Sequence, residues 1–558
     1  MAGIAAGYLV GKYLKRVEGV EIAFGLSGGH IESVMDSFTE HGIRAIDVRH
    51  EQSAAMMAHA WSVYTGKVGV CFITAGPGFT NAVTGIANAY LDNAPMVVLC
   101  GRHPVADDLR GALQEMNQAA IIKPLTKWAE TCYQPRRIPE YLAIAFRTAA
   151  EGRPGPVLLE LPADVVNTKI EEDAIPLPSR PANRLRVRPD QAALARAAEL
   201  INEAKNPLLL GGSGVRYSAC GAELEAFVRK TGMPFQLLNC GRGELPDDHP
   251  LSLWETGNMG LMAGISQADL LVVAGLRLNW LFGYGQVIPP ETRMVRIDID
   301  PHEIDRNRVA DAPLAGDLGA TLEALLPLIR RNTDPDWAAQ VRTGGLALLG
   351  DELQQRRTAS DPIHPARLVA RIREAVGEDA YYVIDGGDTS YFGGSGLMSR
   401  HPAGVIGAAS GLFGCLGTGI PFAMTARLAH PDRPVVLLNG DGSFGFNAME
   451  FDTMVRHDIP LVCVVNNDCA WGMIKHSQEL SIGADRVVCS ELGMRHYEKM
   501  VEALGGHGEL VTRDEEIVPA VRRAIESGKP ACVNAVTDPS VTSPATLLFC
   551  KALSGGEG

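Results

Sequence analysis

Short runs of apolar residues alternate with longer amphipathic stretches along the whole chain. Toward the N-terminus the apolar runs are Val68–Thr74, Met96–Cys100 and Val157–Leu161. Runs of this length between turn residues predict buried strands, and the stretches between them predict helices. The alternation therefore predicts a parallel sheet that is covered by helices on both faces.

The same pattern occurs twice more. The middle of the chain contains the runs Pro207–Leu210, Leu270–Ala274 and Met294–Ile299, and the alternation starts again at Tyr381. Residues 166–190 are rich in proline and charge, and residues 331–363 mix charged, polar and helical-looking patches, so both are predicted to be linkers. We therefore expect an α/β protein with three doubly wound parallel-sheet domains, at residues 1–170, 190–330 and 362–558.

Composition narrows the class of protein. The 558 residues carry a net charge of −14, which does not favour a nucleic-acid partner. The 11 cysteines are scattered without a C-x-x-C pair, as in proteins of a reducing cytoplasm, so we expect a cytoplasmic location. Lys12, Lys15 and Arg16 follow the first apolar stretch, the reverse of a secretory signal. We expect no membrane span, because no run approaches the roughly 18 to 20 apolar residues that one requires.

Polar residues follow two of the predicted strands in the last domain. The run Val435–Asn439 leads into Gly440, Asp441 and Gly442, and the run Ile459–Val465 leads into Asn466 and Asn467. The carboxyl ends of neighbouring parallel strands lie at one edge of the sheet, so Asp441 and Asn467 should converge there. A carboxylate, an amide oxygen, a nearby carbonyl, assigned to Cys469, and two phosphate oxygens suit Mg²⁺. The spacing thus predicts a diphosphate–magnesium site.

Three further blocks extend this motif into a family resemblance. They are Arg49–Met56 (RHEQSAAM), Thr74–Asn81 (TAGPGFTN) and the segment from Gly152 to Asp164 that ends in LPAD. With GDG and NN, they resemble the acetolactate synthase-type family of thiamin diphosphate enzymes. The resemblance implies thiamin diphosphate and Mg²⁺ as cofactors, bound by Glu51, Thr389 (or Asp388), Gly414, Leu416, Gly440, Asp441, Gly442, Ser443 and Asn467.

Two of these residues have specific roles in the family. A glutamate that matches Glu51 hydrogen-bonds N1′ of the aminopyrimidine and favours its imino tautomer; the alternative for Glu51 is an exposed helical glutamate. Leu416 matches the bulky residue that bends the cofactor, although a core leucine would give the same pattern.

The substrate side resembles other members of the superfamily. The segment Phe24–Glu32 (FGLSGGHIE) looks like the corresponding segment of benzaldehyde lyase, which implies that His30 and Gln114 move protons at the carbinol oxygen. A structural histidine is the alternative for His30, and the segment after Gln114 is one residue shorter here than in the relative. Met473, His476 and Ser477 are expected in the pocket wall, with His476 either at the rim or solvated.

The central domain resembles a different branch. Gly275–Trp280 (GLRLNW), with Asp298 and Asp300, is similar to 2-hydroxyacyl-CoA lyases and oxalyl-CoA decarboxylases, which implies that ADP or FAD could bind there. Arg277 would then contact a phosphate, or else form a structural ion pair.

These resemblances lead to one expected activity and two alternatives. The expected enzyme is a C–C lyase and carboligase acting on 2-hydroxy ketones, aldehydes or 2-hydroxyacyl-CoA. The alternatives are a 2-keto acid decarboxylase or acetolactate synthase-type transferase, and an inactive nucleotide-binding paralogue. In the family the two ends of the cofactor are bound by two subunits, so a homodimer, assembled into a homotetramer as a dimer of dimers, is expected.

Overall fold

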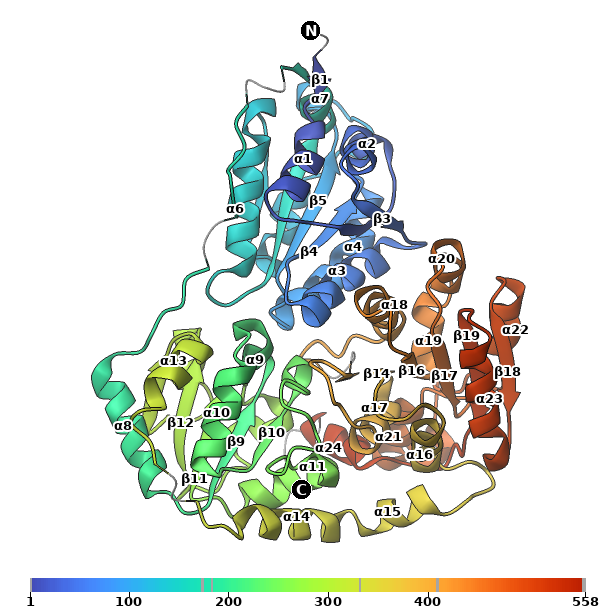
Figure 1. Cartoon of the computed structure of the whole chain (residues 1–558). Coiled ribbons are helices and arrows are strands. Elements are labelled where there is room, and N and C mark those ends of the chain that lie inside the picture. Colours follow the sequence, from blue (N-terminus) through green and yellow to red (C-terminus); the bar gives the residue numbers. More distant parts are fainter. Residues whose placement is uncertain (1–2, 172–174, 182–183, 331–332, 408–410, 554–558) are drawn as a thin grey trace. The chain divides into compact units, whose positions relative to one another are not determined.

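The computed structural model describes residues 3–171, 175–181, 184–330, 333–407 and 411–553 (Figure 1). The chain divides into two compact units, residues 1–185 with 452–457, and residues 186–451 with 458–558. The first contains one parallel sheet and the second contains two. Three α/β domains with parallel sheets are therefore confirmed.

The first sheet has six parallel strands in the order β3-β2-β4-β5-β7-β6. The strands are β2 (Ile22–Gly25), β3 (Arg44–Asp47), β4 (Gly69–Ile73), β5 (Met96–Arg102), β6 (Trp128–Thr131) and β7 (Pro156–Pro162). The helices are α1 (Tyr8–Arg16), α2 (Glu32–Glu40), α3 (Glu51–Thr65), α4 (Pro77–Leu91), α5 (Gln118–Ile122), α6 (Ile138–Ala150) and α7 (Ala163–Asn167), while β1 (Ile4–Ala5) pairs antiparallel with β8 (Lys169–Ile170).

Helices α3 and α4 approach each other closely because their contact is built from small residues. A Cβ on Gly85 of α4 would lie 2.7 Å from the Cβ of Ala55 and 2.9 Å from the carbonyl oxygen of Gln52, both on α3. Almost all of α3 is buried, which places its first residue, Glu51, inside the protein.

The central sheet has five parallel strands in the order β10-β9-β11-β12-β13. They are β9 (Pro207–Gly211), β10 (Phe235–Leu237), β11 (Leu270–Ala274), β12 (Arg293–Asp298) and β13 (Ala312–Ala315). Apolar clusters cover both faces, with helices α8 (Gln191–Glu203), α9 (Ser213–Ser218), α10 (Gly221–Thr231), α11 (Gly257–Ile265), α12 (Pro301–Ile304), α13 (Leu318–Leu325) and α14 (Trp337–Leu348).

The predicted linker at 331–363, whose first two residues lie outside the described part, is mostly helical. Helices α14 and α15 (Gly350–Arg357) occupy it. Trp337 of α14 is buried in the central core, and its indole N–H donates to the carbonyl of Pro207 at 2.9 Å. An amphipathic helix that buries a tryptophan belongs to the domain on which it packs, so α14 is not a free linker.

The third sheet has six parallel strands in the order β15-β14-β16-β17-β19-β18. They are β14 (Tyr381–Asp385), β15 (Val405–Gly407), β16 (Val435–Gly440), β17 (Val462–Asn467), β18 (His507–Val511) and β19 (Ala531–Val536). The helices are α16 (Pro365–Val376), α17 (Gly387–Gly396), α18 (Gly419–Ala429), α19 (Asp441–Asn447), α20 (Glu450–His457), α21 (Gly472–Ile482), α22 (Tyr497–Ala503), α23 (Asp514–Glu526) and α24 (Pro544–Leu553).

A buried arginine joins the central domain to the third one. Arg242 is 4% exposed, stacks on Trp254 with its guanidinium carbon 3.5 Å from the ring centroid, and pairs with Asp247. The same guanidinium donates to the carbonyls of Gly394 and Leu397 at 2.9 and 2.7 Å. The central and third domains both supply hydrogen-bond acceptors to this one guanidinium, which ties them into a single compact unit.

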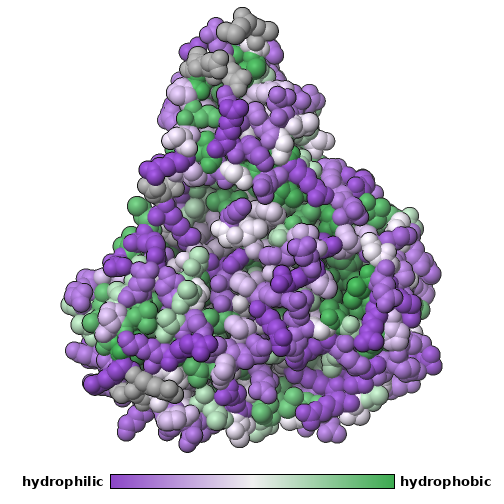
Figure 2. All heavy atoms as spheres, viewed as in Figure 1, coloured by the Kyte–Doolittle hydropathy of each residue, from purple (hydrophilic) through white to green (hydrophobic). Residues whose placement is uncertain are grey.

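The surface is mixed in polarity. On the face drawn in Figure 2, hydrophilic residues are interspersed with smaller hydrophobic patches. Among the helices of the described ranges, none combines the length and the apolar character needed to cross a membrane.

Candidate active site

The carboxyl edge of the third sheet brings the predicted polar turns together. Gly440, at the end of β16, is in register with Asn466 of β17. The Asn466 side-chain amide donates to the hydroxyl oxygen of Thr389 at 2.9 Å, which ties the first turn of α17 to the end of β17. Asp441, Asn467 and Thr389 therefore lie at one edge, as the spacing predicted for Asp441 and Asn467.

A glycine at the end of β14 leaves this edge open to a ligand. Gly386 has a φ of 127°, and a Cβ there would lie 3.1 Å from the Cβ of Thr389 and 3.3 Å from the backbone nitrogen of Gly440. Directly after these turns begin α17 and α19, whose first N–H groups have no partner within their own helices. Such groups at a sheet edge suit a phosphate.

In the first unit, the side chain of Glu51 is buried and is held in place by a hydrogen bond. It is 5% exposed, and one carboxylate oxygen accepts a hydrogen bond from the side chain of Asn81 at 3.0 Å. Its other oxygen, Oε1, would lie 3.3 Å from a Cβ on Gly78. The alternative of an exposed helical glutamate is thus wrong, because Glu51 begins a helix that packs inside the domain. Asn81 stands in the TAGPGFTN block, but its contact with Glu51 was not predicted.

His30 lies at the end of β2, in a short 3₁₀ helix (Gly29–Ile31). Its Nδ1 is 3.3 Å from the hydroxyl oxygen of Thr74. Burial lowers the pKa of His30, the Leu113 carbonyl opposes this by accepting a hydrogen bond from the ring, and the charge of His103 lowers it further. The ring is therefore held by hydrogen bonds and favours its neutral form.

Gln114 lies at the same edge of the first sheet, in a left-handed backbone conformation with a φ of 60°. Its Cβ would be 2.7 Å from a Cβ on Gly76, so only glycine fits there. Within the part of the chain that the structure describes, the buried amide oxygen of Gln114 has no hydrogen-bond partner. The turn from Thr74 to Gly78 thus contacts His30, Gln114 and Glu51 in succession.

Comparison with known proteins agrees with this arrangement. Three models of the thiamine pyrophosphate enzyme match the chain: the N-terminal TPP binding domain over residues 5–121, the central domain over 194–325 and the C-terminal TPP binding domain over 385–535. An acetolactate synthase large subunit of Mycobacterium tuberculosis is 36% identical over 547 residues, 97% of each chain.

The chain belongs to the thiamine pyrophosphate enzyme family. It is thus a thiamin diphosphate-dependent enzyme, as the resemblance implied. Two other relatives carry names of different reactions. Human 2-hydroxyacyl-CoA lyase 2 is 31% identical, covering 93% of this chain and 88% of its own, and Escherichia coli oxalyl-CoA decarboxylase is 30% identical, covering 93% of both. The names of these relatives include lyase and transferase activities. Membership of the family therefore establishes the cofactor but does not identify the substrate.

The third domain of this thiamin diphosphate enzyme fits a divalent cation at Asp441. Burial, and then the neighbouring carboxylate of Asp468, raise the pKa of Asp441, which is 3% exposed. Two adjacent buried carboxylates repel each other, and a divalent cation would relieve that repulsion. Ser443, in the first turn of α19, uses its hydroxyl to bond Asp385, and its contact with the diphosphate stays a prediction.

The other two predicted metal ligands are engaged within the protein. The side-chain oxygen of Asn467 accepts from the N–H of Cys469 at 3.1 Å, and its amide donates to Asn534 at 2.9 Å. The carbonyl of Cys469 accepts N–H groups of Leu492 and Gly493 at 2.8 and 2.9 Å. It would therefore have to give up one of them to bind a metal. Asn534, a lone asparagine in the apolar strand Ala531–Val536, was missed by the sequence analysis although its polarity was a usable signal.

Gly414 and Leu416 lie in the loop before α18. Gly414 is exposed with a φ of 61°, and Leu416 is half-buried. A side chain that remains half-exposed does not match the alternative of a plain core leucine. Its role in bending the cofactor stays a prediction.

The predicted pocket-wall residues lie on α21. A Cβ on Gly387 would be 2.7 Å from the Cβ of Met473, so Met473 contacts the first turn of α17. The Ser477 hydroxyl oxygen is 3.3 Å from the sulfur of Cys550 in α24. His476 is buried rather than solvated, with Nδ1 3.2 Å from Asp388 and Nε2 3.0 Å from the carbonyl of Pro539.

In the central domain, Arg277 contacts Glu303, with 3.8 Å between the guanidinium and a carboxylate oxygen. Glu303 also pairs with Arg306 at 3.0 Å. Burial raises the pKa of Asp298 to about 6. The contact between Arg277 and Glu303 is the structural ion pair that was the alternative to phosphate binding by Arg277. Binding of ADP or FAD stays a prediction.

Proposed function

We propose that this enzyme is a thiamin diphosphate- and Mg²⁺-dependent C–C lyase and carboligase that acts on 2-hydroxy ketones, aldehydes or 2-hydroxyacyl-CoA. The observation that supports it is the grouping of His30 and Gln114 with Glu51 around the turn from Thr74 to Gly78. Cleavage of a bond next to an alcohol requires groups that take and return the hydroxyl proton, and a neutral histidine with a nearby amide is suited to that.

The proposal assigns a role to each group of the chain. When bound, thiamin diphosphate supplies the carbon nucleophile that adds to a substrate carbonyl. Glu51 holds a proton at the aminopyrimidine ring. The neutral imidazole of His30 accepts the hydroxyl proton, and the side-chain amide of Gln114, at the same turn, orients that hydroxyl by donating an N–H to its oxygen. Asp441 and Asn467 hold Mg²⁺, and the first N–H groups of α17 and α19 bind the diphosphate.

The pocket wall bears on the choice of substrate. Met473, against the first turn of α17, would narrow the pocket and favour aliphatic over aryl substrates, since methionine is long but adaptable. The alternative, acetolactate formation or decarboxylation of a 2-keto acid, is favoured by the names of the synthase and decarboxylase relatives.

Turnover of defined substrates tests the proposal. Purified protein with thiamin diphosphate and Mg²⁺ should cleave acetoin to two molecules of acetaldehyde, or a 2-hydroxyacyl-CoA to an aldehyde and formyl-CoA. It should also join small aldehydes in the reverse direction. Release of carbon dioxide from pyruvate or oxalyl-CoA, with no cleavage of the hydroxy compounds, would instead establish the alternative. If none of these substrates reacted, the proposed chemistry would be wrong.

A further inference from the structure

A buried glutamine, Gln118, bonds the turn from Thr74 to Gly78. It is the first residue of α5 and is only 1% exposed. Its side-chain oxygen accepts the backbone N–H of Gly76 at 2.8 Å. Its side-chain nitrogen donates to the carbonyl of Gly101 at 3.0 Å and to a carboxylate oxygen of Glu160 at 3.1 Å. Both the donor end and the acceptor end of this amide are therefore engaged.

The partners of Gln118 fix the orientation of its amide. In the flipped orientation, the NH₂ group would face the N–H of Gly76 and the oxygen would face the carbonyl of Gly101. Glu160, on β7, is 2% exposed and is itself held by the backbone N–H of Ala119 at 3.2 Å and by the hydroxyl of Thr131. No other common side chain of this length offers a donor and an acceptor together, so the position requires glutamine.

The bond to Gly76 holds the turn at its most adaptable residue. Gly76 has a φ of 61° and a ψ of −114°, a conformation that residues with a side chain rarely adopt. Glycine has the greatest conformational freedom, so this geometry persists only where surrounding groups impose it. The hydroxyl of Thr74, two residues earlier, is 3.3 Å from Nδ1 of His30. The bond from Gln118 therefore fixes the turn on which His30 rests.

The bond to Gly101 closes the base of the loop that carries Gln114. This loop, residues 103–117 and here termed the Gln114 loop, begins after β5 and ends where α5 begins at Gln118. Gly101 also contacts His30, because a Cβ on Gly101 would lie 2.8 Å from the Cβ of His30. One amide thus joins the strand from which the loop departs, the helix at which it ends, and the turn beside them.

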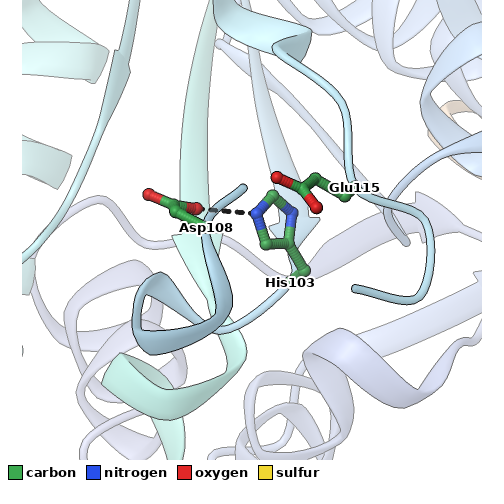
Figure 3. A group of neighbouring side chains, drawn as sticks. All are labelled: His103, Asp108 and Glu115. Carbon is green, nitrogen blue, oxygen red and sulfur yellow. Dashed lines mark hydrogen bonds and ion pairs between the residues drawn. The ribbon is translucent and has the colours of Figure 1, made fainter. Parts of the chain in front are cut away.

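The Gln114 loop is bonded within itself. His103 bonds Asp108, with 2.7 Å between Nε2 and a carboxylate oxygen, and Glu115 lies next to them (Figure 3). Glu115 accepts three backbone N–H groups at 2.6, 2.9 and 3.0 Å, those of Leu109, Gly111 and Ala112. These bonds favour displacement of the loop as a unit, so a shift at its base would carry Gln114 with it.

We propose that Gln118 is a positioning residue for the reaction: its amide ties the turn from Thr74 to Gly78 to the base of the Gln114 loop and so fixes His30 and Gln114 relative to each other. The inference rests on the proposed function, in which these two groups handle the hydroxyl proton of the substrate. Proton transfer requires its groups within hydrogen-bond reach, and a misplacement of about 1 Å can cost about 10²-fold in rate.

Kinetics of the holoenzyme, loaded with thiamin diphosphate and Mg²⁺, separate positioning from a purely structural role. Gln118→Met keeps the length of the side chain and removes its hydrogen bonds. It should lower kcat for cleavage roughly 10- to 100-fold, at a temperature where the variant is fully folded, and change the KM for thiamin diphosphate much less. A purely structural amide would lower the unfolding midpoint and leave kcat of the folded enzyme unaltered.

Gln236→Met is the matched control. Gln236 is also fully buried, on β10 of the central sheet, and its amide donates to the carbonyl of Gly257 at 3.2 Å. The control should leave kcat unchanged, because that amide touches neither the turn nor the Gln114 loop.

An exchange of the two buried side chains provides a rescue. Gln118→Glu alone would place two carboxylates against each other and should impair kcat as strongly as Gln118→Met. Adding Glu160→Gln restores one amide facing one carboxylate and keeps an oxygen for the N–H of Gly76. The double variant should recover kcat roughly tenfold over Gln118→Glu, a coupling of about 1.4 kcal/mol between the two positions.

Hydrogen exchange gives a readout that needs no turnover. In the holoenzyme, Gln118→Met should speed amide exchange in peptides that cover residues 74–78 roughly tenfold, because the N–H of Gly76 loses its acceptor and the turn opens locally. Gln236→Met should leave exchange there unchanged.

Two results would overturn the proposal: an unaltered kcat in folded Gln118→Met, or unaltered exchange over residues 74–78. If Gln118→Met did not fold, the exchange of side chains would decide, and a double variant no faster than Gln118→Glu would count against the proposal. An enzyme that cleaved no hydroxy compound would refute the proposed function and leave the exchange measurement valid.

Discussion

The carboxylate of Glu51 is nearly buried, with Asn81 on one oxygen and Gly78 beside the other. Only a residue without a side chain lets a flat ring approach Oε1 at that distance. Asn81 keeps the carboxylate from rotating, so Oε1 is presented in one direction. The position thus combines a fixed acid with space for a planar partner.

Replacing Glu51 tests this arrangement. Glu51→Gln keeps the size and the bond to Asn81 but removes the acid, so kcat should fall by roughly 10²- to 10⁴-fold, the usual contribution of a positioned acid or base. Bound thiamin diphosphate, measured by fluorescence titration, should change little. Glu32→Gln, at the exposed first residue of α2, is the control. Full activity of Glu51→Gln would refute the assigned role.

The lowered pKa of His30 predicts how kcat/KM for cleavage depends on pH. Burial lowers its pKa from 6.5, so the neutral ring predominates at pH 7 and above. In wild type, kcat/KM for cleavage should be flat there and fall only below pH 6.5, where the ring becomes protonated. In His30→Ala the value should be lower throughout and should lose this acid limb. An unchanged acid limb in the variant would assign the titration to another group.

Several residue contacts could not be predicted from the sequence. The GDG and NN turns located Asp441 and Asn467, because turns at the ends of parallel strands meet at one edge. Glu51 was located by the resemblance of the RHEQ block to thiamin diphosphate enzymes. The path of the loop that carries Gln114 depends on two non-glycine residues with positive φ, Leu109 and Gln114, which no periodicity encodes. The occupied carbonyl of Cys469 likewise depends on residues 492 and 493, more than twenty positions later.

At the scale of elements, Asp388 connects three helices. From the first turn of α17 it bonds His476 of α21, the hydroxyl of Ser543 and, at 2.5 Å, the hydroxyl of Thr546 in α24. The bond to Asp388 is the main cause of a raised pKa of His476, and the Pro539 carbonyl adds to it. The protonated ring therefore stabilises the packing of these helices.

The stability of this junction should depend on pH. A raised pKa in the folded state means that the stabilisation is complete below the unfolded pKa of about 6.5 and is lost as the pH rises through the folded value. His476→Gln should thus lower the thermal unfolding midpoint more at pH 6 than at pH 8, by differential scanning calorimetry. His302→Gln, at an exposed position, should show no such difference. An equal loss at both pH values would mean that the neutral ring is sufficient.

The strands were easier to predict than the connections. The apolar runs at 68–74, 96–100 and 435–439 are β4, β5 and β16 to within one or two residues, because a strand buried on both faces needs a continuous apolar run. The segment at 331–363 was predicted as a linker because charged residues mask the burial of Trp337. Its helix α14 is defined by a contact with Pro207, far away in the chain.

At the scale of the whole molecule, Glu51 and Asp441 belong to different compact units. We propose a homodimer as the minimal active form, with two dimers in a tetramer, because each cofactor would then be shared by two chains. Mixing inactive Glu51→Ala and Asp441→Ala chains should restore part of the activity, measured after dissociation and reassembly, since some sites would combine an intact glutamate with an intact metal site. Mixed oligomers without activity would mean that each chain completes its own site.

The arginine that joins the central and third domains also limits how the gene can be divided. A fragment that began at residue 362 would lose Arg242 and Asp247 and leave the carbonyls of Gly394 and Leu397 and the N–H of Ser399 without their partners. A fragment that ended at residue 361 would keep the guanidinium in its apolar setting against Trp254 with fewer acceptors. Exchange of domains with a relative, whether by recombination or by design, therefore has to move the central and third domains as one piece.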